Sequence, residues 1–184
     1  FGQADFIAYY LAALIVRQVT GSWVVWQINE EVRTGTLSMR LLRPIHPFFG
    51  YAATHLSAIP LRGLVALPFA VLLLLTTARE SLTGDPVLWL LVLPALAGAW
   101  VLAFFALVLL GALGLFVERS LAIFDVYLGV FAVLSGYLLP LALLPDWAAS
   151  VAAVTPFRFM LSFPIELAMG AVDGRGHALA LLGL

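Results

Sequence analysis

Four long apolar runs constrain what this chain can fold into more than any other feature. A helix that crosses a membrane needs roughly 20 mostly apolar residues, and the runs 6–28, 57–78, 87–117 and 121–144 all reach that length. Only 10% of the 184 residues are charged, whereas a soluble domain carries about 25%. The sequence therefore predicts an all-α, polytopic transmembrane helical bundle that forms a single domain over residues 1–184.

Two apolar stretches contain residues that weaken helices. Two spans within 87–117 would need roughly 40 residues and a turn, so we expect one tilted helix there. That helix would be loosened by Pro94, Gly98, Gly111 and Gly114. In residues 145–170, three prolines leave apolar pieces of about ten residues, the length of a re-entrant or interfacial segment. These prolines are Pro145, Pro156 and Pro164.

The arginines indicate the orientation of the chain, because cytoplasmic loops of membrane proteins are enriched in basic residues. Loop 29–56 contains three arginines, and the short turn 118–120 contains one. In loop 79–86 a single arginine is balanced by two carboxylates, and segment 145–176 is acidic overall. We therefore expect 29–56 and 118–120 in the cytoplasm, and 79–86 and 145–176 outside.

Several classes of function are disfavoured by what the sequence lacks. There is no cysteine, which excludes disulfides and thiolate metal sites. His46, His55 and His177 lack metal-ligand spacing, and we expect His46 and His55 to lie beside lipid headgroups. HExxH, GxSxG and Walker motifs are absent, so we expect no metal, no cofactor and no catalysis in this chain. A net charge of −1 argues against a nucleic-acid partner.

A charged island at residues 29–47, "NEEVRTGTLSMRLLRPIHP", separates the first two apolar runs. Gly35 is suited to end the first helix, since glycine adopts left-handed dihedral angles without steric cost. Thr36 can then cap a short helix that Pro44 terminates. Two turns are far below the roughly 12–15 residues that a helix needs to persist in water, so tertiary contacts must hold it. Its leucines need cover, either from the membrane surface or from a partner protein.

The same island resembles the cytoplasmic motif of type-2 ABC transporter permeases, in which an acidic-basic stretch precedes Gly-Thr-Leu, a leucine pair and a proline. The version "EEVRTGTLSMRLLRPIHP" is similar to DrrB-like and viologen-exporter-like permeases, although Ser38 stands where many members have an acidic residue. Downstream, "LSGYLLPLALLPDW" and "TPFRFMLSFP" also resemble the family, so the likeness extends over about 20–170. The four runs would then be spans two to five of six, in a chain that lacks a span at each end.

The resemblance also implies partners and site residues. It implies a coupling helix that docks on an ATP-binding subunit, which would hold the ATP and magnesium, and a second permease subunit, identical or related. It further implies export of a small amphipathic or cationic molecule across a bacterial cytoplasmic membrane. The residues it assigns to docking are Glu31, Arg33, Gly35, Thr36, Leu37, Leu41, Leu42, Arg43 and Pro44.

Two further charged residues are candidates for a translocation pathway. Arg17 lies about halfway along the first run, where a charge costs a few kcal/mol. It either contacts a substrate group or extends towards an interface, and we favour the second interpretation. Glu166 either pairs with Arg158 or faces an exit path. An ion-coupled carrier, a non-transporting scaffold and an intramembrane enzyme remain alternatives, and the carrier would usually need embedded carboxylates.

Overall fold

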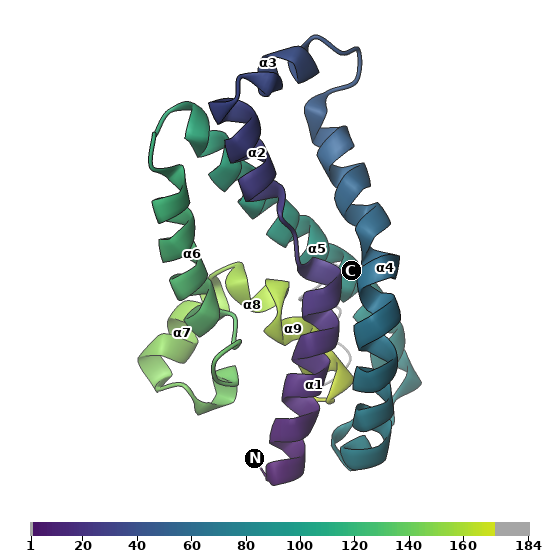
Figure 1. The fold of residues 1–184 in the computed structure, drawn as a ribbon. Coiled ribbons are helices and arrows are strands. Elements are labelled where there is room, and N and C mark those ends of the chain that lie inside the picture. The colour runs from purple at the N-terminus through teal and green to yellow at the C-terminus, as the bar shows by residue number, and fades with distance from the viewer. Residues whose placement is uncertain (1, 172–184) are drawn as a thin grey trace.

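The computed structural model describes residues 2–171, without the side chains of residues 65 and 66. All regular elements in this part of the chain are helical, which confirms the all-α prediction (Figure 1). The long helices are α1 (Gln3–Thr20), α2 (Val24–Arg33), α4 (Pro47–Thr77), α5 (Pro86–Ala112) and α6 (Ser120–Leu134). The short ones are α3 (Thr36–Leu41), α7 (Asp146–Val154), α8 (Phe157–Met160), α9 (Ser162–Ala168) and the 3-10 turns η1 (Arg79–Ser81), η2 (Leu113–Leu115) and η3 (Leu141–Leu143). The end of segment 145–176 and any later span lie outside the described residues.

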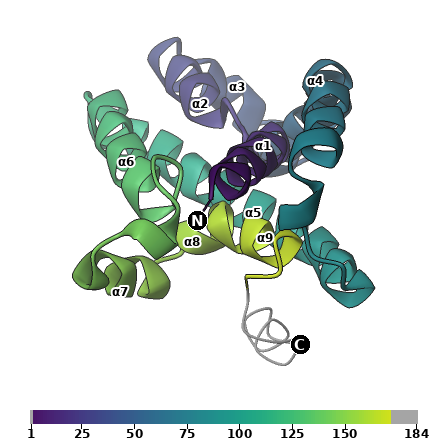
Figure 2. The ribbon, with the colours of Figure 1, turned by 90° about the horizontal axis from the view of Figure 1, so that it is seen from below.

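Helix α5 is the element around which the others pack. It contacts α1, α2, α6, α8 and α9, and Figure 2 shows these helices arranged around it. Asp85 caps its start, because the carboxylate accepts the Val87 N–H at 2.9 Å, and Pro86 occupies the first helical position. The helix continues through Pro94 to Ala112. The prediction of one long helix in this run is therefore confirmed.

The prediction of one continuous helix over the first apolar run, 6–28, is wrong, because the helix is interrupted in the middle of the run. Helices α1 and α2 are separated by Gly21, Ser22 and Trp23, and Gly21 is extended (φ −61°, ψ 129°). The two helices together, Gln3–Arg33, are still long and apolar enough to cross a membrane, as is Pro86–Leu115. The run therefore forms a candidate broken span in place of a continuous one.

The second predicted span starts earlier than the apolar run. Helix α4 begins at Pro47 instead of residue 57, because His46 accepts the Phe48 N–H at 3.2 Å and proline is favoured at the first helical position. The helix bends by 53° between Leu64 and Leu67 and ends at Thr77. If the bent pair counts as one span, it is a third candidate by length and composition among the described residues.

The fourth predicted span, 121–144, is too long. Helix α6 has only 15 residues and ends at Leu134, short of the roughly 20 that a span needs. Gly136 then takes a left-handed conformation (φ 80°), and the chain runs irregularly to η3. The predicted division of 145–170 into short pieces is confirmed as α7, α8 and α9. Pro145 and Pro156 precede α7 and α8, whereas Pro164 lies inside α9 and does not interrupt it.

Candidate docking loop and membrane cavity

The loop between α2 and α4 contains the predicted short helix, α3. Gly35 adopts φ 74°, the left-handed conformation expected of a residue that ends a helix. Thr34, directly before it, is the C-cap residue of α2. The prediction that Thr36 caps α3 is wrong, because Gly35 holds that position and the Thr36 hydroxyl lies 2.9 Å from that of Thr34. Helix α3 ends at Leu41, three residues before Pro44, so proline does not terminate it directly.

Apolar side chains on and just after α3 face away from the bundle. None of the α3 residues is buried, and Leu41 and Leu42 are 59% and 81% exposed. Met39 and Ile45 are 69% and 66% exposed. Leu37, four residues before Leu41 in the same helix, is only partly exposed. We call Met39, Leu41, Leu42 and Ile45 the apolar cap.

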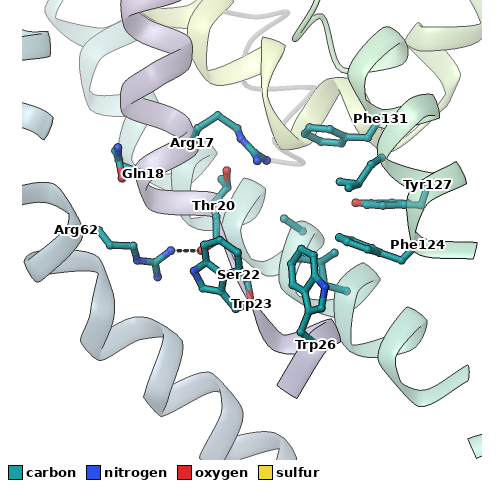
Figure 3. Close-up of a pocket in the computed structure, with 14 residues that line it drawn as sticks. Arg17, Gln18, Thr20, Ser22, Trp23, Trp26, Arg62, Phe124, Tyr127 and Phe131 are labelled. Atoms are coloured by element: carbon teal, nitrogen blue, oxygen red, sulfur yellow. Dashed lines mark hydrogen bonds between the residues drawn. The ribbon is translucent and has the colours of Figure 1, made fainter. Parts of the chain in front are cut away.

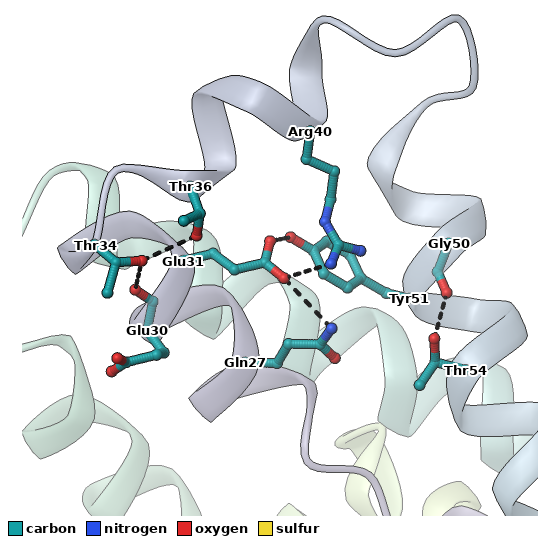
Figure 4. A network of polar contacts seen from close by, with 9 residues as sticks. All are labelled: Gln27, Glu30, Glu31, Thr34, Thr36, Arg40, Gly50, Tyr51 and Thr54. Atoms are coloured by element: carbon teal, nitrogen blue, oxygen red, sulfur yellow. Dashed lines mark hydrogen bonds and ion pairs between the residues drawn. The ribbon is translucent and has the colours of Figure 1, made fainter.

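A polar network ties α3 to its two neighbours (Figure 4). Arg40 of α3 forms an ion pair with Glu31 of α2 at 2.7 Å, and its guanidinium lies 4.8 Å from the ring centroid of Tyr51 in α4. The Tyr51 hydroxyl donates to Glu31 at 2.5 Å, and Gln27 donates to the same carboxylate at 3.4 Å. Among the predicted docking residues, Glu31 binds Arg40 and Tyr51, and Thr36 forms a hydrogen bond with Thr34. Arg33 ends α2, Arg43 and Pro44 follow α3, and all three residues are exposed.

Arg40 and Tyr51 were not among the residues predicted for this site. The sequence offered a weak signal for Arg40, which lies among the arginines of the charged island. It offered none for Tyr51, because the helix that carries Tyr51 was expected to start later. Their contact depends on how α4 packs beside α2, which local sequence patterns do not report.

A cavity of about 340 Å³ opens at the break between α1 and α2 (Figure 3). Its walls come from α1, the break, α2, α4, α5 and α6. Arg17 of α1 reaches into it and lies 5.5 Å from the ring centroids of both Phe131 and Tyr137. The structure thus places Arg17 at a cavity wall against aromatic rings. Its predicted role in a translocation pathway remains a prediction.

Arg62 of α4 lines the same cavity but, unlike Arg17, forms hydrogen bonds with backbone carbonyls. Its guanidinium donates to the backbone carbonyls of Gly21 and His55, the latter at 3.2 Å, and to Ala58 within its own helix at 3.3 Å. Carbonyls at a helix end inside a membrane need a polar partner, either from the protein or from water in a cavity. Arg62 therefore satisfies the end of α1 from a neighbouring helix, a role that its place near a predicted loop did not suggest.

Glu166 lies elsewhere. It pairs with Arg158 at 2.6 Å, one of the two alternatives expected, and lines a second cavity of about 310 Å³ with Tyr9 and Pro140. The structure therefore does not bring Arg17 and Glu166 to one cavity. Within residues 2–171, no group of three His, Asp or Glu side chains is arranged to hold a metal ion.

The two described histidines differ from each other. His46 is exposed, whereas His55 is only 4% exposed and packs 6.0 Å from the Phe104 ring. The prediction of headgroup contact is therefore wrong for His55, because α4 turns this residue towards α5.

One comparison with known proteins identifies the family. No curated protein and no solved structure matches the chain. The family model described as "ABC-2 family transporter protein" matches residues 3–183, nearly the whole sequence. Permeases of this family are membrane subunits of ABC transporters and work with an ABC ATP-binding subunit. The chain, a helical membrane protein with a short helix between α2 and α4, belongs to the ABC-2 transporter family.

Proposed function

We propose that this chain is the permease of an ATP-driven exporter and that α3 is the helix that docks on the ATP-binding subunit. The observation that carries the proposal is the apolar cap, whose side chains are all more than half exposed on and just after a helix that buries none of its own residues. Covering a leucine of this kind contributes about 1.5–3 kcal/mol. Family membership supplies the kind of partner that would cover it.

The network at the base of α3 makes it suitable for passing on movement. Arg40 and its partners Glu31 and Tyr51 belong to three different helices. A displacement of α3 would therefore act on α2 and α4 together. We expect closure of two ATP-binding subunits, with their ATP and magnesium, to move the spans by this route.

The remaining parts of the proposal concern direction, assembly and place. We infer export of a small amphipathic molecule across a bacterial cytoplasmic membrane, as in the DrrB-like and viologen-exporter-like branch. Two permeases, identical or related, would enclose the pathway, with Arg17 and Glu166 as candidate lining residues. An ion-coupled carrier would usually need several carboxylates within its spans. Asp125 of α6 is the one carboxylate that we expect for that role, and Glu166 is paired with Arg158. A scaffold that only recruits a partner is separated from the exporter by the experiment below.

The test replaces Leu41 and Leu42 together by aspartate in the full-length permease, expressed with the ATP-binding subunit. We expect co-purification of the two subunits and substrate-stimulated ATP hydrolysis to be lost, because two charges would replace the exposed apolar contact. Val154→Asp is the matched control, since Val154 is 88% exposed on α7 at a distance from α3. Normal assembly and stimulation in the double variant would refute docking through α3.

A second variant separates docking from coupling. Tyr51→Phe removes the hydroxyl that binds Glu31 and leaves the apolar cap intact. We expect this variant to co-purify normally and to stimulate hydrolysis less than the wild type. A scaffold would show assembly without any substrate-stimulated hydrolysis in the wild type itself.

A further inference from the structure

We propose that the cavity at the break between α1 and α2 binds a small amphipathic anion, with a carboxylate, sulfonate or phosphate group on Arg17 and an aromatic or acyl body on the α6 wall. The inference deepens the proposed function and rests on it, since it names the substrate class of the same transporter. It departs from the cationic substrates that the resemblance implies.

The charged side chains that line the cavity are the first evidence for an anionic ligand. Two arginines, Arg17 and Arg62, are among its lining residues, and no Asp or Glu is among the described ones. Arg62 already binds three backbone carbonyls. The Arg17 side chain makes no ion pair or hydrogen bond with a described residue, and its guanidinium lies over two aromatic rings. Because an uncompensated charge inside a membrane protein is costly, the cavity favours a ligand that brings a negative charge.

The geometry of Arg17 suits an oxyanion. Its guanidinium lies at equal distances, 5.5 Å, from the Phe131 and Tyr137 centroids. Rings hold a guanidinium by cation–π attraction and leave its N–H groups available. A guanidinium presents paired donors that match the two oxygens of a carboxylate, sulfonate or phosphate. Figure 3 shows the Arg17 side chain extending from α1 towards Phe131.

The opposite wall is a row of aromatic rings. Phe124, Tyr127 and Phe131 lie three and four residues apart, on one face of α6, with neighbouring centroids 6.2 and 6.1 Å apart. Trp26 extends the row, since its ring centroid lies 4.7 Å from that of Phe124, and Trp23 lies 5.3 Å from Trp26. This wall provides contact for a flat or extended apolar body. A volume of about 340 Å³ is near the lower end of the roughly 300–1,000 Å³ of ligand pockets, so the body is small.

The test uses three dansyl probes that share one aromatic body: dansylglycine is an anion, dansylethylenediamine a cation and dansylamide neutral. Binding to the full-length permease in discs of neutral lipid is measured by energy transfer from tryptophan. Because Trp23 and Trp26 line the cavity, Trp26→Phe should reduce the transfer. We expect the wild type to bind dansylglycine more tightly than the other two probes.

Arg17→Gln should weaken dansylglycine about tenfold, as expected for a lost charged hydrogen bond, and should leave dansylamide unchanged. Unchanged dansylamide binding also shows that the variant is folded. Arg17→Glu should reverse the preference towards the cation. Arg79→Gln, which removes an exposed arginine of η1, is the matched control. Equal affinity of the wild type for the three probes, or an unaltered preference in Arg17→Gln, would overturn the inference.

A repeat in discs that contain anionic lipid identifies the source of the ligand. Competition by the lipid would support the site with a lipid headgroup as occupant, whereas unchanged binding would support a free amphipathic anion. The outcome is independent of docking. Loss of anion preference with intact ATPase stimulation would refute only this inference, and loss of stimulation with intact preference would leave the cavity assignment standing.

Discussion

Two of the apolar runs contain a break in helical geometry in their interior, and the polar groups of the two breaks are satisfied differently. At the break between α1 and α2, the charged side chain of Arg62 binds the exposed carbonyl of Gly21. After α6, neutral hydroxyls do this work: Tyr9 donates to the Gly136 carbonyl at 2.7 Å, and Ser162 donates to that of Ser135 at 2.5 Å. The first break borders the cavity of about 340 Å³. At the second break, Ser135 and Gly136 are buried against α1 and α9, and Pro140 lines the second cavity.

The difference teaches what each break tolerates. Irregular backbone at membrane depth persists only where protein or a water-filled cavity satisfies its polar groups. A long guanidinium can reach across an open cavity and bind several carbonyls at once. A hydroxyl group binds a carbonyl only where the two chain segments pack closely. The hydroxyl of Tyr9 therefore fixes the chain after α6 against α1. We therefore expect the first break to be sensitive to charge and the second to be sensitive to shape.

The largest effect is expected at the first break. Arg62→Leu removes charged hydrogen bonds to the carbonyls of Gly21 and His55, at roughly 1.5–3 kcal/mol each, so we expect a loss of about 4 kcal/mol in unfolding free energy. Denaturant unfolding of the purified permease in mixed micelles measures the loss. Arg62→Lys, with a single ammonium group, should recover part of it. Equal stability of Arg62→Leu and the wild type would show that Gly21 needs no partner.

The next effect tests shape at the second break. A methyl group on Gly136 would clash with the hydroxyl oxygens of Ser162 and Tyr9, and the left-handed conformation itself disfavours alanine by about 1–2 kcal/mol. We expect Gly136→Ala to cost about 3 kcal/mol in total. Gly129→Ala in α6 is the control, since nothing lies within 4 Å of the added carbon, and it should be neutral or slightly stabilising. The same unfolding measurement compares the two, and similar effects would contradict the assignment.

A smaller effect is expected for the hydroxyl itself. Tyr9→Phe removes the donor to the Gly136 carbonyl, which should cost about 1–2 kcal/mol. Tyr10→Phe removes a comparable bond, to Leu138 at 2.7 Å, but from a side chain that is 40% exposed. Its loss should therefore be the smaller of the two. A larger loss for Tyr10→Phe would mean that burial does not set the strength of these bonds.

The smallest effect sharpens the contrast between charge and shape. Glu166→Gln near the second break keeps a hydrogen-bond acceptor for Arg158 but removes the negative charge. Both side chains are partly exposed, at 18% and 24%, so we expect a change of about 1 kcal/mol or less. Thermal unfolding in detergent at low and high salt measures it. A loss as large as that of Arg62→Leu would show that the second break also depends on charge.

The sequence predicted the helical class, the single helix of α5 and the short helix after Gly35, because each rests on a local signal. It missed the break after Thr20, because Gly21 and Ser22 are only two residues in a run that is otherwise mostly apolar, and they do not lower its apolar content enough to signal a break. It extended α6 into residues 135–144 for the same reason, although Gly136 and Pro140 were available as signals. The partners that stabilise these breaks, Arg62 and Tyr9, come from distant helices, and no local pattern reports such contacts.

Helix α2 has a mechanical consequence that follows from its length and its ends. Its ten residues make a rod about 15 Å long, with a left-handed glycine at one end and the Gly21–Trp23 break at the other. Val24, Val25 and Ile28 of this rod pack against α5, and neither joint continues the helix. If α3 docks as proposed, a displacement of α3 would act on one end of the rod, and Trp26 of the same rod lines the cavity. Lengthening α2 by one turn would move the two ends of the rod about 5.4 Å further apart and would displace Glu31 from Arg40 and Tyr51 or Trp26 from the cavity.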